Sequence, residues 1–213
     1  MMKDFPLFTT EYGVASLVLR EIPYREEAYI TIQDASEPEL LLQECVSFCR
    51  MCGAEKIYAK GHEILESRPL HTAVLEMKCP RECIPDTDAA LWPVQEKNLS
   101  EWREIYNRKV RAVPNGAWMT EADGKDMLTE GDGYFIHRDG VLLGIGRASG
   151  SMIDWVASLV PGGGREVVCA LAHAVTEDTA TLTVASTNEK AIRLYESMGF
   201  VKSREISRWY QVL

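Results

Sequence analysis

Two segments near the C-terminal end of the sequence carry the residues that could bind an anion and transfer a proton. In the first, SLVPGGGREVV at residues 158–168, the glycines Gly162, Gly163 and Gly164 separate an apolar run from a helical pattern. N–H groups at a helix N-terminus are unpaired, and glycines let a phosphate approach them closely. Arg165 could add a charge-assisted hydrogen bond. The segment predicts a pyrophosphate site, although a glycine turn can also be only a flexible connection.

The second segment is NEKAIRLYESMGF, residues 188–200, and its tyrosine could act as an acid. Asn188 is a preferred N-cap residue, and Gly199 provides the left-handed residue that ends a helix. The apolar residues fall on one helical face, which consists of Ala191, Ile192, Tyr195 and Met198. Tyr195 is therefore expected to point into the core or into a cleft. A packed tyrosine and a proton donor both fit this pattern.

The composition is that of an ordinary globular protein. The chain has 213 residues, of which 46% are hydrophobic and 26% charged, and its formal net charge is -9. An excess of acidic residues disfavours electrostatic binding to nucleic acid or anionic lipid. No apolar run approaches the roughly 20 residues of a membrane span, and the N-terminal segment MMKDFPLFTTEYG does not read as a signal peptide. We expect a soluble, cytoplasmic monomer or homodimer that binds neither nucleic acid nor membrane.

The six cysteines raise the question of a metal site. Cys45, Cys49 and Cys52 share a helical face with Leu41 and Phe48, and free cysteine packs as a small hydrophobe. The C-x-x-C pair occurs once, without the second pair that a zinc site of this type needs. We expect structural cysteines and no metal, with a zinc site as the alternative.

A proline-rich and acidic segment, CPRECIPDTDAALWP at residues 79–93, marks the expected domain boundary. We expect a smaller α/β domain over residues 1–88 and a second domain over residues 89–213. Hydrophobic periodicity predicts the elements of the first domain, which are strands at residues 15–22, 28–34, 56–60 and 71–79 and a helix at residues 37–53.

The second domain reads as two helices followed by a mixed sheet with further helices. Its expected helices are at residues 99–113, 121–128, 165–175 and 188–198, and its expected strands at residues 133–138, 141–149, 151–160, 180–186 and 200–213, with a further strand possible at 90–94. Asp139-Gly140 is a strong hairpin signal between two of these strands. The fold class is therefore α/β (α+β), with a mixed, mostly antiparallel central sheet flanked by helices.

This order of motifs resembles the GNAT family of acyl-CoA-dependent N-acetyltransferases. The similarity covers residues 91–213, and its most specific part is the pattern Asn188, Ala191, Leu194-Tyr195-Glu196 and Gly199-Phe200. The resemblance implies an enzyme with the GNAT-like acyl-CoA N-acyltransferase fold. It also implies acetyl-CoA as co-substrate, without a metal, and transfer of an acetyl group to a primary amine of a small molecule or a protein.

The resemblance extends to the residues of the site. In the family, the glycine turn holds the pyrophosphate of coenzyme A and the preceding strand pairs with the pantetheine arm. The implied cofactor-binding residues are Ala157, Leu159, Val160, Gly162, Gly163, Gly164, Arg165, Asn188 and Tyr195. A strand N–H near residues 157–159 would stabilise the oxyanion, and Tyr195 would protonate the departing thiolate. Leu159 stands where the family usually has Gln or Arg, and Glu166 adds a negative charge near the phosphates.

The general base is less well defined by the sequence. Asp154 is the one carboxylate in residues 151–160, and Glu121 and Asp123 are weaker candidates. Aromatic candidates for contact with the acceptor are Trp118, Trp209 and Tyr210. A non-catalytic acyl-CoA-binding or protein-interaction module is the alternative function.

The first domain resembles a degenerate copy of the same fold, as in family members with tandem copies. Its strand, helix and strand over residues 28–60 repeat the order found over residues 152–186. The corresponding turn, DASEPEL at residues 34–40, contains no glycine. We expect no cofactor there.

Overall fold

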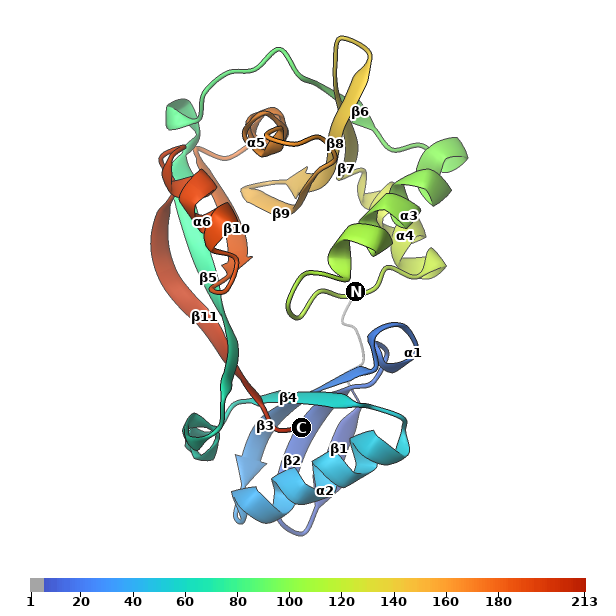
Figure 1. Cartoon of the computed structure of the whole chain (residues 1–213), viewed down its shortest axis with the longest axis vertical. Coiled ribbons are helices and arrows are strands. Elements are labelled where there is room, and N and C mark those ends of the chain that lie inside the picture. Colours follow the sequence, from blue (N-terminus) through green and yellow to red (C-terminus); the bar gives the residue numbers. More distant parts are fainter. Residues whose placement is uncertain (1–5) are drawn as a thin grey trace. The chain divides into compact units, whose positions relative to one another are not determined.

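The computed structural model describes residues 6–213, which form two compact units (Figure 1). The first unit comprises the chain up to Ala73 together with Ser207–Leu213, and the second comprises Val74–Ile206. Strands β5 (Leu70–Pro80) and β11 (Val201–Gln211) each contribute residues to both units. The expected domains over residues 1–88 and 89–213 stay a prediction.

In the first unit, helix α2 covers one face of a sheet with the strand order β1-β2-β3-β4-β11. The elements are β1 (Leu7–Thr10), β2 (Gly13–Val18), α1 (Ile22–Arg25), β3 (Glu27–Ala35), α2 (Pro38–Met51), β4 (Lys56–Lys60) and a 3-10 helix at Glu63–Ser67. β3 and β4 are parallel and stay in register from Glu27 opposite Lys56 to Thr31 opposite Lys60. This strand, helix and strand form a closed βαβ unit, because the two strands do not separate along that stretch.

The cysteines of α2 pack as hydrophobic side chains. Cys45 and Cys49 are completely buried in the core beside Leu41. Burial raises the pKa of Cys45 to about 11 and that of Cys49 to about 12, so both thiols stay protonated at neutral pH. The predicted packing role is confirmed for these two residues and is wrong for Cys52, which is exposed at the end of the helix. Among residues 6–213, no three His, Cys, Asp or Glu side chains group as metal ligands.

The second unit is a sheet with the order β11-β5-β10-β9-β8-β7-β6, with helices on both faces (Figure 1). Its further elements are 3-10 helices at Arg81–Cys83 and Glu96–Asn98, β6 (Ala90–Pro93), α3 (Leu99–Val110), α4 (Glu121–Glu130), β7 (Gly133–Arg138), β8 (Val141–Ser149), β9 (Met152–Ser158), α5 (Gly164–Ala172), β10 (Thr179–Ala185) and α6 (Glu189–Glu196). Most neighbouring strands are antiparallel, whereas β9 and β10 are parallel. The predicted mixed α/β class is confirmed.

The β7–β8 hairpin follows from its two turn residues. Asp139 has φ 52° and Gly140 has φ 78°, the two positive values that a type I′ turn requires. The turn sets the register in which Arg138 pairs with Val141. The predicted hairpin is confirmed.

Helices pack on the two faces of the second sheet through different residues. On one face, Trp102 of α3 is completely buried and donates from Nε1 to the carbonyl of Tyr134 at 3.0 Å. On the other face, α5 lies so close to β8 that a Cβ on Gly144 would be 2.7 Å from Val167. A Cβ on Gly146 would likewise overlap Leu171. The glycines of β8 therefore serve close helix packing.

Glu76 of β5 is a nearly buried carboxylate held by donors from β11 and β5. The hydroxyl of Ser203 donates to Oε1 at 2.6 Å, Arg204 donates to Oε2 at 3.1 Å, and Lys78 Nζ lies 3.4 Å from Oε1. These groups favour the charged form and lower the pKa of Glu76 from its usual 4.5 to about 2.

We predict that Glu76 makes the protein less stable in acid. Because the pKa is lowered in the folded state, the stabilisation is present above about pH 4.5 and is lost as the pH falls toward 2. Urea unfolding between pH 6 and about pH 2.5 should show this loss for the wild type and much less of it for Glu76→Gln. Glu177→Gln, at an exposed position, should keep the wild-type pH dependence. An equal slope for all three proteins would contradict the prediction.

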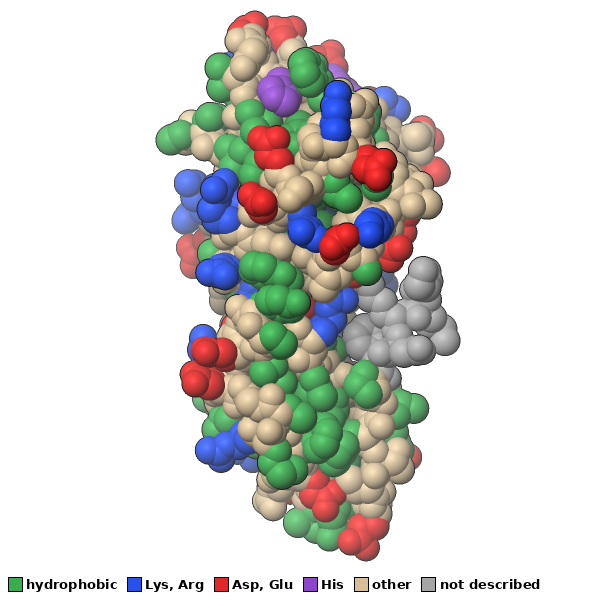
Figure 2. Space-filling view, turned by 90° about the vertical axis from the view of Figure 1, so that its right-hand side faces the viewer, with side chains coloured by type: hydrophobic (Ala, Val, Ile, Leu, Met, Phe, Trp, Pro, Cys, Tyr) green, Lys and Arg blue, Asp and Glu red, His purple; other side chains and the backbone are tan. Residues whose placement is uncertain are grey.

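The surface carries charges of both signs. On the face shown in Figure 2, Lys and Arg side chains are interspersed with Asp and Glu side chains. Within the part of the chain that the structure describes, no helix combines the length and the apolar character needed to cross a bilayer.

Candidate functional site

In the glycine turn between β9 and α5, a positive φ favours glycine at one position and close packing favours it at the next two. Gly162 has φ 79°, and the space that a Cβ there would occupy has no neighbour within 4 Å. At Gly163, a Cβ would lie 2.5 Å from the side chain of Val160, and at Gly164 it would lie 3.1 Å from Leu194. The turn is thus open at Gly162 and closely packed at the next two residues.

The N-terminus of α5 presents unpaired donors at this turn. Gly163 donates its N–H to the carbonyl of Val160 at 3.2 Å, and no side chain caps the helix. The N–H groups of Gly164, Arg165 and Glu166 have no backbone acceptor among the described residues. Unpaired N–H groups and the positive end of a helix dipole together favour an anion. These N–H groups lie next to the open position at Gly162.

The charges near the turn are arranged differently from the expectation. Glu166 forms an ion pair with Arg138, which lies at the end of β7. The negative charge that Glu166 brings to the turn is therefore compensated. Arg165 is exposed and reaches Ser197 at 3.5 Å, so its guanidinium lies toward the end of α6. Sequence reasoning missed Arg138, because only the fold of the sheet brings the end of β7 to α5.

Strands β9 and β10 separate beyond their first residues. They pair at two positions, Met152 with Thr181 and Ile153 with Leu182, although β9 continues to Ser158 and β10 to Ala185. Parallel strands that part in this way leave backbone groups without a ladder partner. We call the opening between residues 154–158 and residues 183–185 the strand gap.

The hydrogen-bond pattern of β9 decides which backbone groups face the strand gap. Leu159 donates its N–H to Leu143 of β8 at 2.8 Å, and Ala157 pairs with Ile145 of the same strand. Because the bonding direction alternates along a strand, the N–H groups of Val156 and Ser158 point away from β8. Of residues 157–159, only Ser158 therefore has an N–H that points away from β8 and into the strand gap. The N–H of Val156 points to the same side. The side chains of Ala157 and Leu159 pack in the core under α3.

A lysine that the sequence analysis did not single out lies at the strand gap. Lys109, in the last turn of α3, donates from Nζ to the carbonyl of Ser158 at 2.9 Å. No acidic group among the described residues forms an ion pair with this partly buried ammonium. A basic residue near the end of a helix is ordinary, and the sequence could not show that this one reaches β9.

Tyr195 lies on the inner face of α6 as predicted. It is 8% exposed, and its ring centroid is 6.0 Å from that of Phe200. Burial raises the pKa of Tyr195 to about 12. Its hydroxyl forms no hydrogen bond with any described residue, and the contact of Leu194 with Gly164 brings α6 beside the glycine turn. The structure thus brings together the two segments that the sequence suggested for chemistry.

Asn188 and Gly199 define the ends of α6 as predicted. The side chain of Asn188 accepts a hydrogen bond from the N–H of Ala191 at 3.2 Å. Gly199 has φ 95° and lies just beyond the helix. Both expected helix signals are confirmed. Asn188 is exposed at the start of α6, and α5 and β10 separate it from the glycine turn along the chain.

Asp154 occupies a bulge of β9. The register with β8 shifts there, so that Arg147 pairs with Trp155, Ala148 pairs with Ile153, and Asp154 is left unpaired. Although the side chain of Asp154 is exposed, partial desolvation by its neighbours raises its pKa; Arg147 opposes this rise, and the nearby Asp132 and Glu130 add to it. A raised pKa suits a carboxylate that has to take up a proton near neutral pH.

Arg147 compensates Asp154 only in part because it is bound to other carboxylates. Its Nη2 lies 2.5 Å from Asp132 and 3.0 Å from Glu130. The bulge is therefore surrounded by more negative than positive charge. A protonated amine would be attracted to it.

The other candidates for base and acceptor contacts have structural partners. Glu121 forms an ion pair with Lys125 at 2.8 Å, and Asp123 accepts the N–H of Thr120 at 2.9 Å in a capping box. The guanidinium carbon of Arg111 lies over the ring of Trp118, 5.4 Å from the ring centroid. Tyr210 is a core residue of the first unit, and Trp209 packs there against Tyr29. Of the carboxylates considered, Asp154 is the one whose pKa is raised.

Comparison with known sequences identifies one related family. Residues 161–210, which include the glycine turn and α6, match the family model described as FR47-like protein. No curated protein sequence matches the chain.

Comparison with solved structures finds the same fold in proteins of low sequence identity. A functionally unknown conserved protein from Staphylococcus epidermidis has a TM-score of 0.62 at 12% identity, over 98% of this chain and 93% of that one. An acetyltransferase of the GNAT family from Colwellia psychrerythraea has a TM-score of 0.53 at 14% identity, over 96% and 84%. A tandem GNAT protein from the clavulanic acid biosynthesis pathway has a TM-score of 0.51 at 14% identity, over 94% and 78%.

Proposed function

Because this chain has the GNAT fold and an FR47-like C-terminal segment, we propose that it is an N-acetyltransferase that transfers an acetyl group from acetyl-CoA to a primary amine. The observation that carries the proposal is the open glycine turn at the N-terminus of α5, next to a gap between two parallel strands. The acceptor is a small molecule or a protein side chain. The FR47-like segment contains both the turn and Tyr195.

The residues around the turn and the strand gap fit coenzyme A. Gly162 leaves room for a pyrophosphate, the N–H groups of Gly164 and Arg165 are free to donate to it, and Arg138 compensates Glu166. Val156 and Ser158 would donate to the pantetheine arm and to the carbonyl of the acyl group. We propose that Val160, Gly163 and Asn188 support this site through the backbone of the turn and the start of α6. Lys109 would have to leave the carbonyl of Ser158, and its ammonium could then neutralise phosphate charge.

Two groups of the chain would stabilise the negative charge that develops during transfer. When bound, acetyl-CoA supplies an acetyl thioester. The unpaired N–H of Val156 or Ser158 would stabilise the negative charge that develops on the carbonyl oxygen. Tyr195 would donate a hydrogen bond or a proton to the departing sulfur. With a pKa of about 12 for the hydroxyl and about 8.5 for a thiol, complete transfer costs about 5 kcal/mol, so we infer that the hydroxyl acts chiefly by hydrogen bonding.

We propose Asp154 as the general base that takes a proton from the acceptor amine. Its position on the β9 bulge and its raised pKa support this role. A direct attack by the amine then needs no covalent intermediate on the protein. A protonated amine would also be attracted by the acidic groups around Arg147.

The test is a measurement of thiol release from acetyl-CoA with a panel of amines. We predict turnover for the wild type and a fall in kcat/KM of about a hundredfold for Asp154→Asn, with the same affinity for acetyl-CoA. Activity should decline at low pH, where Asp154 becomes protonated. Asp126→Asn, at an exposed position of α4, should behave as the wild type. Binding of acetyl-CoA without thiol release for any amine would contradict catalysis and indicate an acyl-CoA-binding module.

For the first part of the chain we propose a degenerate GNAT-like copy over residues 1–88, with the acetyltransferase copy over residues 89–213. In its βαβ unit, β3 and β4 remain paired from Glu27 to Thr31, and the turn before α2 has no glycine. A cofactor site of the kind proposed above would therefore lack both the gap and the open turn. The tandem GNAT protein among the similar structures supports this interpretation.

A further inference from the structure

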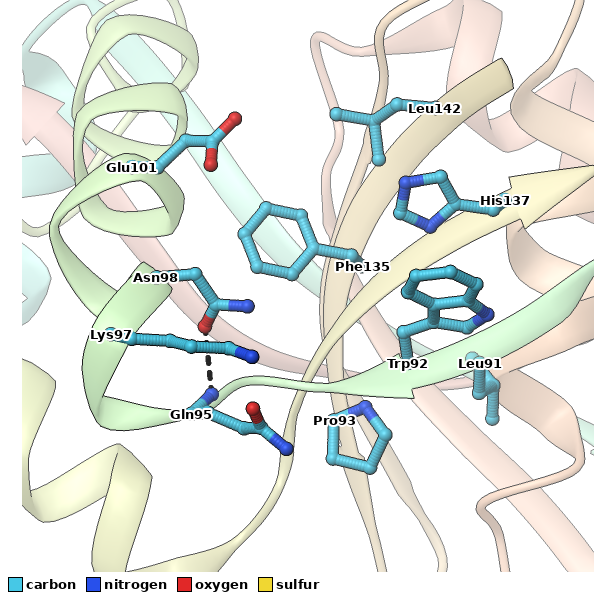
Figure 3. A pocket seen from close by; sticks show the side chains of 10 residues that line it. All are labelled: Leu91, Trp92, Pro93, Gln95, Lys97, Asn98, Glu101, Phe135, His137 and Leu142. Carbon is cyan, nitrogen blue, oxygen red and sulfur yellow. Dashed lines mark hydrogen bonds between the residues drawn. The ribbon is translucent and has the colours of Figure 1, made fainter. Parts of the chain in front are cut away.

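A cavity lies in the second unit, and none of its lining residues bounds the strand gap. It has a volume of about 540 Å³ and is bounded by β6, β7, the start of β8 and the N-terminal part of α3. We call it the β6 pocket and define it by Trp92, Lys97, Glu101, Phe135, His137 and Leu142 (Figure 3). Its volume is within the range of about 300–1,000 Å³ for small-molecule sites. Its lining residues come from β6, β7, β8 and the segment up to the first turn of α3, whereas the strand gap lies between β9 and β10.

One wall of the β6 pocket is aromatic. The ring centroid of His137 lies 4.7 Å from that of Trp92 and 6.3 Å from that of Phe135 (Figure 3). Trp92 is 59% exposed, although an indole ring is normally covered. An exposed tryptophan beside a cavity offers a stacking surface for a planar ring.

The opposite side of the pocket carries one acidic and one basic group. Glu101 extends from α3 and Lys97 from the 3-10 turn before it, both toward the aromatic wall (Figure 3). Neither side chain forms an ion pair or a hydrogen bond with any residue between 6 and 213 that the structure describes. Asn98, by contrast, is occupied, because its Oδ1 accepts the N–H of Gln95 at 2.7 Å. The pocket therefore presents a free carboxylate and a free ammonium.

His137 adds an unpaired polar atom to this wall. Its Nδ1 is buried and has no hydrogen-bond partner among the described residues. An unpaired buried nitrogen is unfavourable, and a bound molecule or water that supplied a partner would relieve it.

We propose that the β6 pocket binds a free aromatic α-amino acid. The ring would stack on Trp92 and His137, the ammonium would pair with Glu101, and the carboxylate would pair with Lys97. A zwitterion with a planar side chain offers one group for the aromatic wall and one for each of the two charges. Because none of the residues that line this pocket belongs to β9 or β10, the amino acid would act as an effector and not as the acceptor of the acetyl group.

Titration calorimetry without acetyl-CoA tests the proposal independently of the proposed transferase activity. We expect L-phenylalanine to bind the wild type, and 2-phenylethylamine, 3-phenylpropanoate and L-alanine each to bind at least about fivefold more weakly, because each lacks one of the three matched groups. Trp92→Ala should weaken binding by about tenfold, and Trp92→Phe should restore most of it. Glu101→Gln and Lys97→Gln should each weaken it by about fivefold.

A control and three outcomes complete the test. Asp126→Asn, which changes an exposed carboxylate of α4, should bind as the wild type does. 2-Phenylethylamine lacks the carboxylate, so binding as tight as that of phenylalanine would overturn the role of Lys97. 3-Phenylpropanoate lacks the ammonium, so binding as tight as that of phenylalanine would overturn the role of Glu101. No binding of phenylalanine, tyrosine or tryptophan by the wild type would overturn the proposal as a whole.

Discussion

Replacing Gly162 by Asp is expected to weaken the binding of acetyl-CoA by more than about a hundredfold. Aspartate tolerates the positive φ of this residue better than most side chains, and the space for its Cβ is empty, so the turn should keep its shape. The new carboxylate would then lie where the pyrophosphate is proposed to bind. At about 5 Å and an effective dielectric constant near 20, two like charges repel by about 3 kcal/mol. Titration calorimetry with acetyl-CoA measures the effect.

The matched control is Gly162→Asn, which has the same shape and no charge. Its affinity should fall by about tenfold at most, because only backbone strain and size differ from glycine. Gly163 is a poorer position for the test, since a Cβ there would already overlap Val160. Equal affinities for the Asp and Asn variants would show that no phosphate lies near residue 162.

Replacing Tyr195 by Phe should lower kcat by about a hundredfold while the affinity for acetyl-CoA stays close to that of the wild type. The change removes the hydroxyl and keeps the ring that packs against Phe200. The hydroxyl has no hydrogen-bond partner among the described residues, so its loss should cost little stability. Steady-state kinetics, with thermal unfolding of the same preparation, separates the two effects.

The pH dependence of the Tyr195→Phe defect provides a second readout. Because burial raises the pKa of Tyr195 to about 12, the hydroxyl should stay protonated from pH 6 to 10. The ratio of wild-type to variant kcat should therefore be constant over that range. A ratio that falls to one toward pH 10 would show that another group protonates the sulfur.

Local signals made most elements of the second unit predictable. The Asp139-Gly140 turn fixed the hairpin, Asn188 and Gly199 bounded α6, and apolar periodicity placed Tyr195 inward. Each of these signals acts within a few residues, so it can be read without knowledge of the tertiary structure. The glycine turn was predictable for the same reason.

The charges and hydrogen bonds of the candidate site were not predictable in this way. The pair of Arg138 with Glu166 joins residues from the hairpin and α5, and the contact of Lys109 with Ser158 joins α3 to β9. The separation of β9 from β10 also depends on strand pairing rather than on local sequence. These features arise from tertiary packing, and a single sequence without its fold does not specify which distant residues meet.

The pairing of β5 shows a similar limit. The prolines between residues 79 and 93 suggested that β5 belongs with the first part of the chain. In the structure, β5 pairs with β10 of the second unit from Val74 to Pro80. Proline marks the end of a strand, but it does not show which sheet the strand joins.

The measurement that tests the central claim most directly is hydrogen–deuterium exchange with and without coenzyme A. The claim is that the cofactor binds at the glycine turn and the strand gap of the second unit. We predict slower exchange for amides in residues 156–167 when coenzyme A is present, and unchanged exchange in residues 34–45, the corresponding turn and helix of the first unit. Slower exchange in residues 34–45, or no change in residues 156–167 at a saturating concentration of coenzyme A, would contradict the claim.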